Sequence, residues 1–318
     1  MKRVLVVGSI NMDQIFRLDH LPRPGETVLA ADVITVPGGK GANQAVAAAR
    51  TFAPAPRADA WAGRVQMVGR LGADPFGRSL RAGLIAAGVD VAAVREDAAA
   101  ATGVALILLA EGQDNSIIVA SGANMRVAPA DLDAVDWAEV GVLLVQLEIP
   151  FETVAEAMRR ARAAGALVIL DPAPARGCPA DLLALADILT PNETEAGDLV
   201  GMAIGDVASA MEAARRLRSS ERQRVIVKLG GQGLVVCDAD GCRHLPAIPV
   251  RVVDTTAAGD AFCGALAARL AEAASFDEAL RYAMAAGALA VTALGAQPSL
   301  PTRNAVEALL RSRMYGEL

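Results

Sequence analysis

One short segment combines small residues with a carboxylate in a pattern that suits phosphoryl transfer. It reads Asp254-Thr255-Thr256-Ala257-Ala258-Gly259-Asp260, and it lies between a strand-like run at 248–253 and an Ala-rich helical pattern over 258–274. Small residues let the backbone approach a ligand closely, and the free N–H groups at a helix start bind phosphate oxygens. Asp260 belongs to the first turn of that helix and could take a proton from an attacking hydroxyl. Alternatively, Asp260 only complements the helix dipole, which contributes about 0.3–1 kcal/mol.

A second segment, Pro37-Gly38-Gly39-Lys40-Gly41-Ala42-Asn43-Gln44, also leads into an Ala-rich helical pattern. Its spacing does not match the Gly-x4-Gly-Lys-Ser/Thr phosphate loop, and Gln44 occupies the last glycine position of the dinucleotide motif Gly-x-Gly-x-x-Gly. What remains is a glycine pair that allows close approach, beside Lys40 and Asn43, which could hydrogen-bond hydroxyl groups. A plain glycine-rich turn is the alternative.

Asn11 and Asp13 follow the first strand-like run, in the segment Gly8-Ser9-Ile10-Asn11-Met12-Asp13. In open parallel sheets, ligands bind outside the carboxyl ends of the strands. Because Asn11 and Asp13 alternate along the chain, both could face one polyol. An ordinary Asn/Asp turn is the alternative.

Two further segments could serve a nucleotide. Thr190-Pro191-Asn192-Glu193-Thr194-Glu195 lies between a predicted strand and a predicted helix. Asn192 and Glu195 could therefore organise a hydrated Mg²⁺, or they could simply begin the helix. Lys228-Leu229-Gly230-Gly231-Gln232-Gly233 could pass a nucleotide or form a hairpin.

These segments are positioned by an alternation of strand-like and helix-like runs. The strand-like runs are short, apolar and rich in β-branched residues, and amphipathic stretches lie between them. Such an alternation implies a mainly parallel sheet covered by helices on both faces. The strand-like runs are Val4–Val7, Val65–Gly69, Val142–Gln146, Leu167–Leu170, Ile188–Thr190 and Val225–Leu229, and the helical stretches include Asp74–Ala87, Phe151–Ala164, Asp206–Leu217, Ala258–Ala274 and Asp277–Leu294.

Two segments break this rhythm and look like antiparallel strands. They are Thr27–Val36 and Thr102–Ser121, the second with a hairpin turn at 111–115. Because these strands lie outside the alternation of parallel strands and helices, we expect them to form a small separate sheet, which could act as a lid over a site. The Ala/Pro/Arg-rich stretch Phe52–Gly63 is predicted to be a surface loop.

The overall composition argues against several kinds of partner. The chain has 318 residues, a formal net charge of −6 and only 3% aromatic residues, whereas nucleic-acid partners favour a basic face and aromatic stacking surfaces. The most apolar stretches, Gly103–Ala110 and Ala283–Gly295, are shorter than the ~20 residues of a membrane-spanning helix. The apolar run at 4–7 is too short for a secretion signal, so we expect a cytoplasmic protein with no membrane partner.

Cysteine and histidine are used sparingly. The four cysteines have neither a Cys-x-x-Cys pair nor zinc-like spacing, and we expect them to be reduced thiols. The two histidines, His20 and His244, are too few for a mechanism built on several histidines. The cysteines are Cys178, Cys237, Cys242 and Cys263.

In this order and context, the segments resemble the ribokinase-like (PfkB) family of carbohydrate kinases. Residues 38–43 resemble the first signature of that family, and residues 254–260 resemble the second. The resemblance covers nearly the whole chain. It includes Gly8–Asp13, Pro24–Thr27, Gly38–Ala48, Gln146–Glu148, Pro172–Arg176, Thr190–Glu195 and Gly295–Ser299.

The resemblance implies a kinase that transfers phosphate from Mg²⁺-ATP to O5 of D-ribose and is activated by a monovalent cation, usually K⁺. Asp260 would be the general base, and the backbone of Ala257, Ala258 and Gly259 would form the anion hole. The implied sugar-binding residues are Asn11, Asp13, Gly39, Lys40, Asn43, Glu148 and Asp260. The implied ATP-binding residues are Asn192, Lys228, Gly230, Gly233, Ala258 and Gly259; Glu195 would hold Mg²⁺ through water, and Asp254, Thr256, Ala290, Gly295 and Ser299 would hold K⁺.

The same resemblance implies a fold and an assembly. The expected architecture is a single ribokinase-like domain over 1–318, with three α/β/α layers and a mainly parallel central sheet flanked by helices. A small antiparallel β lid would be formed by about 14–36 and 96–120. Lids of two subunits clasp one another in such proteins, so a homodimer is expected.

Four features depart from the pattern of the ribose-phosphorylating members. Asp171 stands where Asn is usual, and Lys228 replaces a Thr, although Lys is common there in the wider family. Met284 lies where a His is often found near the adenine, and the loop over 52–63 is longer than expected. None of these positions touches the implied sugar, so they concern the affinity for the nucleotide.

Three alternatives to a ribose kinase remain open. The first is a kinase of the same family that acts on another sugar or a nucleoside, such as deoxyribose, fructose or pseudouridine. The polar sugar-binding set favours a small free polyol, because a nucleoside base would need apolar or aromatic surface. The second is a non-catalytic sugar-binding protein, against which the presence of Asp260 and of the anion-hole residues counts. The third, a dinucleotide-dependent dehydrogenase, lacks its glycine motif.

Overall fold

Nine strands form the main sheet of the computed structural model, which describes residues 2–52, 64–110 and 116–314. The strand order is β13-β12-β11-β10-β9-β8-β1-β4-β5. All pairs from β11 to β5 are parallel, whereas β12 and β13 add an antiparallel edge. The six predicted parallel strands are confirmed, with ends shifted by a few residues. The strands are β1 (Arg3–Val7), β4 (Val65–Gly72), β5 (Val94–Asp97), β8 (Val140–Val145), β9 (Leu167–Leu170), β10 (Ile188–Leu189), β11 (Arg224–Lys228), β12 (Leu234–Asp238) and β13 (Gly241–Leu245).

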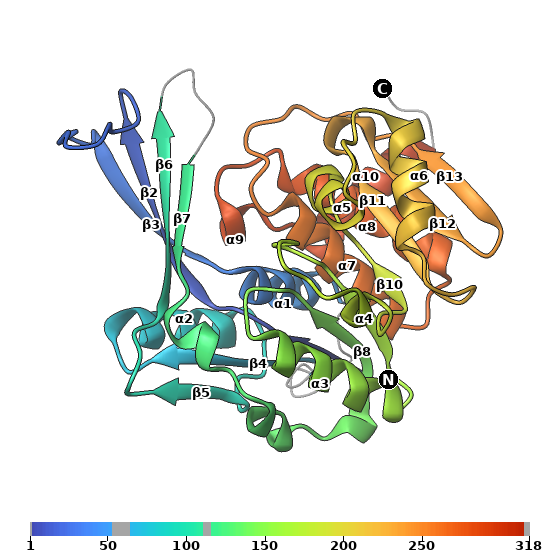
Figure 1. Cartoon of the computed structure of the whole chain (residues 1–318), viewed down its shortest axis with the longest axis horizontal. Helices are drawn as coiled ribbons and strands as arrows, with labels where there is room; N and C mark the ends of the chain where they lie inside the picture. Colours follow the sequence, from blue (N-terminus) through green and yellow to red (C-terminus); the bar gives the residue numbers. More distant parts are fainter. Residues whose placement is uncertain (1, 53–63, 111–115, 315–318) are drawn as a thin grey trace.

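Helices cover both faces of this sheet, which gives the predicted three α/β/α layers (Figure 1). Within β1, Val4 and Val6 pack into one hydrophobic layer, while Leu5 and Val7 pack into the other. Both faces are buried, which explains why the strand reads as a continuous apolar run. One layer contains α1 (Lys40–Thr51), α2 (Pro75–Ala86), α7 (Ala258–Ala271), α8 (Phe276–Ala290) and α10 (Arg303–Met314); the other contains α3 (Phe151–Ala163), α4 (Ala180–Leu183), α5 (Glu193–Val200) and α6 (Val207–Leu217).

Short helical turns connect several of these elements. A run of 3-10 turns joins the small second sheet to β8, another lies between β11 and β12, and a one-turn α-helix precedes α10. Their bounds are η2 (Gly122–Arg126), η3 (Pro129–Ala134), η4 (Trp137–Glu139), η5 (Gly230–Gln232) and α9 (Ala296–Ser299).

A second sheet of four strands, in the order β3-β2-β6-β7, projects from the main body at the left of Figure 1. The strands predicted at 27–36 and 102–121 belong to it, although β3 begins only at Asp32. The β2–β3 and β6–β7 pairs are antiparallel as expected, whereas β2 and β6 run parallel, so the sheet is mixed. Its strands are β2 (Asn11–Leu18), β3 (Asp32–Gly38), β6 (Gly103–Ala110) and β7 (Ser116–Ala120).

Two sequence predictions lie mostly or wholly outside the described residues, namely the loop over 52–63 and the turn at 111–115. A third, the strand predicted at 248–253, is wrong, because this segment pairs with no neighbouring strand. The N–H group of Val253 donates instead to the carbonyl of Val291, just past the end of α8. Pro249 lacks an N–H group, which weakens any ladder that this segment could form.

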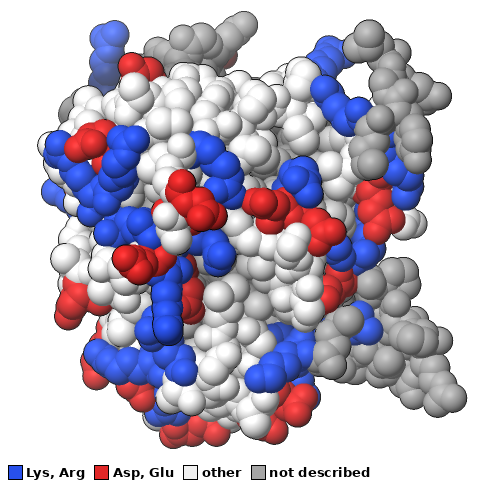
Figure 2. All heavy atoms as spheres, turned by 90° about the vertical axis from the view of Figure 1, so that its right-hand side faces the viewer, with Lys and Arg blue, Asp and Glu red and all other residues white. Residues whose placement is uncertain are grey.

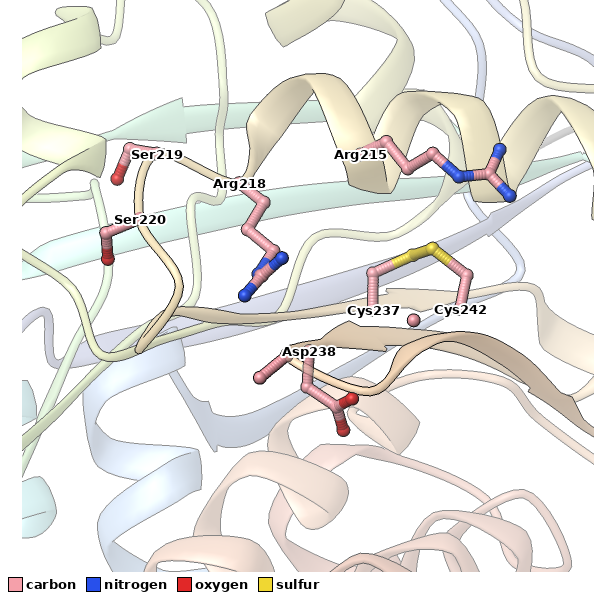
Figure 3. Close-up of a pocket in the computed structure, with 9 residues that line it drawn as sticks. Arg215, Arg218, Ser219, Ser220, Cys237, Asp238 and Cys242 are labelled. Carbon is pink, nitrogen blue, oxygen red and sulfur yellow. A yellow bond between two sulfur atoms is a disulfide. The ribbon is translucent and has the colours of Figure 1, made fainter.

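The prediction that all four cysteines are reduced is also wrong, because Cys237 and Cys242 form a disulfide (Figure 3). The two residues lie directly opposite each other in the antiparallel pair β12–β13, which brings their Cα atoms within 4.1 Å. The disulfide was not predicted because the spacing of five residues matches no known motif and because the β12–β13 hairpin, which brings the two cysteines together, was not predicted either. Cys178 and Cys263 are free thiols.

Acidic and basic side chains are interspersed over the face shown in Figure 2. Several of them form ion pairs one helical turn apart, such as Arg216 with Glu212 on α6. Within the described residues, no helix combines the length and the apolar character needed to span a bilayer.

Candidate active site

The carboxyl ends of neighbouring parallel strands bring several polar residues to one edge of the main sheet. Gln146 follows β8, Asp171 follows β9, Thr190 follows β10, and Lys228 ends β11. The side chains of Gln146, Asp171 and Thr190 are at most 1% exposed. A buried polar group is costly unless it is hydrogen-bonded, so this edge of the sheet must hold a connected polar network.

Close packing of α1 on α7 adds two amides and a carboxylate to this network. A Cβ atom on Gly264 would lie 2.6 Å from the Cβ of Ala47 and 2.7 Å from the backbone nitrogen of Ala48, so the two helices touch through their backbones. This contact places Asn43 and Gln44 of α1 against Asp260 in the first turn of α7. The small residues of both helices therefore position the site as well as the core.

Asp260 is 6% exposed and accepts two amide hydrogen bonds. Asn43 Nδ2 donates to Oδ2 at 3.0 Å, and Gln44 Nε2 donates to Oδ1 at 3.0 Å. Burial raises the pKa of Asp260 above its ordinary value and Asp171 adds to this effect, while Lys40 and the two amides oppose it. A carboxylate with a raised pKa that remains ionisable is suited to accept a proton.

Asp171 and Lys228 form a buried ion pair, with Lys228 Nζ 2.9 Å from Asp171 Oδ1. Burial alone would raise the pKa of Asp171, but Lys228 and Lys40 hold it below its ordinary value. Burial alone would lower the pKa of Lys228, but Asp171 raises it above its ordinary value. A Cβ atom on Gly259 would lie 3.2 Å from Lys228 Nζ, so this ammonium group borders the 257–259 loop.

Asp13 and Asn11 begin the second sheet and lie beside its glycines. A Cβ atom on Gly38 would lie 2.0 Å from Asp13 Oδ2, and one on Gly103 would lie 2.2 Å from Asn11 Oδ1. Asn124 Nδ2 donates to Asn11 Oδ1 at 2.7 Å and so fixes that side chain. Only glycine fits at positions 38 and 103, and a Cβ atom on Gly39 or Gly41 would also lie 2.7 Å from neighbouring backbone atoms. Close approach therefore explains the glycines of the motif at 38–41 better than a plain glycine-rich turn does.

Three buried side-chain oxygens near Asp260 accept no hydrogen bond within the described residues. They belong to Asp13 (Oδ1), Asn43 (Oδ1) and Gln146 (Oε1). Burial, together with the charges of Glu148 and Asp260, raises the pKa of Asp13 to about 7. Acceptors that lack donors suit a ligand rich in hydroxyl groups, because each O–H can donate to one of them.

Glu148 is tied to both glycine-rich segments. Ser9 Oγ donates to Glu148 Oε2 at 2.5 Å, and the backbone N–H of Lys40 donates to the same oxygen at 3.2 Å. Burial would lower the pKa of the Lys40 side chain, but Asp260, Asp171 and Glu148 raise it above its ordinary value. Lys40 therefore carries its charge among three carboxylates.

The 257–259 loop leads into α7 through a left-handed residue. Ala257 has φ 59° and ψ 11°, a conformation that costs a residue with a Cβ atom about 1–2 kcal/mol relative to the right-handed region. The chain turns sharply here, and the N–H group of Ala258 donates to the carbonyl of Thr255 at 3.3 Å, whereas Ala261 makes the first helical bond, to Ala257. The N–H groups that precede Ala261 have no partner within the helix. Helix starts of this kind can bind anions, and this loop contains the predicted anion-hole residues.

The predicted nucleotide residues have well-defined structural partners of their own. Asn192 and Glu195 cap α5 reciprocally, each side chain accepting from the other's backbone N–H at 2.8 Å. Gly233 has φ 94°, and a Cβ atom there would lie 2.1 Å from the carbonyl oxygen of Leu245, so its glycine is required by the β12–β13 hairpin. Gly230 begins the helical turn between β11 and β12, which confirms the hairpin interpretation of this segment.

Asp254 joins the two loops at which a monovalent cation was predicted. Its Oδ1 accepts from the N–H and hydroxyl groups of Thr256, and its Oδ2 accepts from the N–H of Gly295 at 2.8 Å. These hydrogen bonds hold the pKa of Asp254 below its ordinary value despite burial. Ala290 ends α8 and Ser299 ends α9, and neither is among the hydrogen-bond partners of the Asp254 carboxylate, which are Thr256 and Gly295. Within the described residues, no cluster of three or more His, Cys, Asp or Glu side chains could hold a metal ion.

Sequence reasoning missed several members of this network. Three of them, Gln44, Gln146 and Ser9, lie in segments that the sequence analysis singled out, but no role was predicted for them. Thr190 was noted only as the first residue of the segment 190–195. Asn124 was not singled out at all, because it lies in the short η2 turn and follows no motif. Its contact with Asn11 spans 113 positions along the chain.

A surface cavity of about 360 Å³ lies between α6 and the β12–β13 hairpin (Figure 3). Its lining includes Arg215, Arg218 and the Cys237–Cys242 disulfide. None of the site residues predicted from the sequence lines it, so it does not belong to the network around Asp260.

Comparison with known proteins gives consistent matches over nearly the full length. Residues 1–303 match the family model described as pfkB family carbohydrate kinase. Ribokinase of Bacillus subtilis is 41% identical over 312 residues, covering 98% of this chain and 100% of that protein. Deoxyribokinase of Salmonella typhi is 33% identical over 302 residues, covering 94% and 95%. The structure of Arabidopsis thaliana ribokinase complexed with ribose and ATP is similar with a TM-score of 0.84 at 36% identity, covering 98% of this chain and 99% of that one.

Proposed function

Because the chain belongs to the pfkB family of carbohydrate kinases, we propose that it transfers the γ-phosphoryl group of ATP to O5 of D-ribose. The observation that carries this proposal is the buried Asp260 carboxylate, held by two amides in the first turn of α7 beside the 257–259 loop. The substrate follows from the similarity to ribokinases and from the unpartnered oxygens nearby. Phosphorus NMR of the product tests the position of transfer, because a phosphate on O5 couples to two protons on C5.

The sugar would be held by the residues that surround Asp260. Asp13 and Asn43 offer oxygens without donors. The ammonium group of Lys40 and the carboxylate of Glu148 offer opposite charges. Asn11, fixed by Asn124, and the backbone at Gly39 complete the set. Such a polar lining satisfies several hydroxyl groups of one small polyol at once.

In the transfer step, Asp260 would take the proton of the attacking hydroxyl as the new P–O bond forms. The N–H groups of Ala257, Ala258 and Gly259 would receive the charge on the transferring phosphoryl oxygens. Lys228, beside Gly259, would add positive charge at the same end, and Asn192, Gly230 and Gly233 would line the nucleotide. ADP leaves with the electron pair of the broken P–O bond, and Asp260 later returns its proton to solvent.

The residues near the predicted Mg²⁺ position fit a cation. Burial and the charge of Asp171 raise the pKa of Glu195 above its ordinary value, so a positive charge nearby would be favourable. Glu195 Oε2 caps α5 through the N–H of Asn192, and its other oxygen remains able to bind a water of the ion. Mg²⁺ bound with ATP neutralises the phosphates, and Glu195 would hold it through such a water.

The loops around Asp254 also fit the predicted K⁺, since a carboxylate and backbone oxygens are the donors such an ion prefers. Asp254, Thr256, Ala290, Gly295 and Ser299 would hold it, and its charge would order the loop that faces the phosphates. Replacing K⁺ with a bulky organic cation is expected to lower kcat with little change in the KM for the sugar. Equal rates in both salts at matched ionic strength would refute the assigned cation site.

The sugar affinity is expected to depend on pH through Asp13, whose pKa is raised to about 7. Hydroxyl groups that donate to Asp13 favour its ionised form, so binding should strengthen as the pH rises through 7 and level off above it. Calorimetric titration with ribose from pH 5.5 to 8.5 measures this. An Asp13→Asn variant is the control and should bind more weakly without that pH dependence; a flat profile in the unaltered protein would contradict the role.

A homodimer formed through the second sheet is part of the proposal. Ile118 on β7 and Val33 on β3 are 59% and 53% exposed, and the strand register places both on the same face of this sheet, which leaves apolar surface for a second copy. Light scattering should give twice the 32.6 kDa chain mass. Ile118→Lys should shift the protein toward a monomer, and a monomeric unaltered protein would exclude this assembly.

Two further predictions rest on the sequence alone. They are the lid boundaries at about 14–36 and 96–120, and the cytoplasmic location.

Deoxyribose is the second candidate substrate, because the chain is also 33% identical to a deoxyribokinase. The two sugars differ by one hydroxyl group. A site that hydrogen-bonds that hydroxyl leaves buried polar groups unpaired when it is missing, which separates the two substrates strongly.

A further inference from the structure

Gln44 lies between two buried carboxylates and has no part in the reaction described so far. Its side chain is 0% exposed. Its Nε2 atom donates to Asp260 Oδ1 at 3.0 Å and to Asp171 Oδ2 at 2.9 Å. Both protons of one amide are therefore used, each on a different carboxylate.

The orientation of this amide is fixed by its third contact. Gln146 Nε2 donates to Gln44 Oε1 at 2.5 Å. A flipped amide would place Oε1 against the oxygens of Asp260 and Asp171, and Nε2 against the donor of Gln146. All three contacts would then be lost, so only the observed orientation satisfies the network.

The far side of the network is anchored in the rigid edge of the main sheet. Asp171 Oδ1 accepts from Lys228 Nζ at 2.9 Å and from Thr190 Oγ1 at 3.3 Å. These partners come from the carboxyl ends of β9, β10 and β11, which are hydrogen-bonded to one another. Gln44 thus connects Asp260, at the start of a helix, to fixed strand ends.

We infer that Gln44 is a positioning residue for Asp260: it holds the carboxylate in the orientation from which the proton is taken, and it couples that carboxylate to the Asp171–Lys228 pair. The inference rests on the proposed function only in that Asp260 is the base. The contacts themselves do not depend on which sugar is phosphorylated.

The charged groups that face Asp260 set the direction of each expected change. Lys40 of α1 favours its ionised form, whereas Asp171 at the end of β9 disfavours it. Asp13 of β2 also repels it, and Glu148, which follows β8, acts mainly on Asp13 and Lys40. Removing the Gln44 donor should raise the pKa of Asp260, and neutralising Asp171 should lower it.

The first test is a carboxyl ¹³C titration of Asp-labelled protein, with Asp260 assigned by its Asn variant. Gln44→Met removes the amide with little change in volume, and Asp171→Asn removes a charge while leaving an acceptor for Gln44. The pKa of Asp260 should move up in Gln44→Met and down in Asp171→Asn. Shifts in the same direction, or none, would overturn the inference. If Gln44→Met does not fold, the shift of the Asp260 pKa in Asp171→Asn decides by itself whether the two carboxylates are coupled.

Kinetics provide the second test. In Gln44→Met, kcat should fall roughly 10–100-fold, as expected when a base is misplaced by about 1 Å, while the sugar KM stays within about threefold. An unchanged kcat would overturn the inference. An unaltered protein that phosphorylates no sugar would contradict the proposed function instead, and the titration would still decide the role of Gln44.

Discussion

Replacing Asp260 with Asn is expected to lower kcat by about 10²–10⁴-fold, the usual contribution of a general base. The amide has the shape of the carboxylate but cannot take the proton of the sugar hydroxyl. It can still be accommodated, because Asn43 Oδ1 has no partner and a flipped Asn43 could accept from the new amide. The flipped Asn43 would present its Nδ2 to the sugar in place of Oδ1, and a sugar hydroxyl oxygen can accept from it. Sugar binding, measured by calorimetry, should therefore change much less than kcat.

A matched control separates catalysis from a helix-dipole role. Asp277 is also acidic and lies in the first turn of a helix, α8, but its side chain is 63% exposed and pairs with Arg243. Asp277→Asn should lower stability by about 0.3–1 kcal/mol and leave kcat unchanged. If Asp260→Asn behaved like Asp277→Asn, Asp260 would not be the base.

The second large effect is expected from Gly38→Ala. The new Cβ atom would lie 2.0 Å from Asp13 Oδ2 and 2.3 Å from Oδ1, so the carboxylate must rotate away from the sugar. A hydrogen bond to a charged group contributes about 1.5–3 kcal/mol, and losing two of them should raise the sugar KM by roughly 100-fold or more. The KM for ATP should remain near its original value.

Gly83→Ala is the control for this substitution. Gly83 lies within α2, and a Cβ atom there would meet nothing within 4 Å. The variant should be slightly more stable, by about 0.5–1 kcal/mol, and fully active. An unchanged sugar KM in Gly38→Ala would show that Asp13 does not bind the substrate.

The main sheet and its helices could be predicted because their signals are local. Apolar runs such as Val4–Val7 and helical patterns such as 151–164 carry their own periodicity, and parallel strands place their carboxyl ends at one edge. The position of Asp260 in the first turn of a helix could be predicted in the same way, because the small residues at 257–259 stand just before an Ala-rich helical pattern. The resemblance implied only that Asp260 and Asn43 both hold the sugar, and their direct hydrogen bond was not predicted.

The contacts that organise the site could not be predicted, because they join residues far apart in the chain. Asp171 and Lys228 were treated as two separate departures, whereas they form one ion pair across 57 positions. Gln44 was noted only for failing a glycine motif, because nothing local reveals that two carboxylates lie on either side of it. The strand predicted at 248–253 failed for a related reason: its apolar residues suit a strand, but no neighbouring strand is available to pair with it.

The most direct test of the central claim is ADP release by the purified protein with Mg²⁺-ATP and K⁺, with ribose offered beside deoxyribose, fructose, adenosine and pseudouridine. We predict that ribose gives by far the highest kcat/KM, and that Asp260→Asn lowers this turnover by about 10²–10⁴-fold. Turnover on another compound alone would contradict the sugar assignment while leaving the base and the anion hole in place. No turnover on any compound, with sugar binding still detectable, would contradict the assignment of this chain as an active sugar kinase.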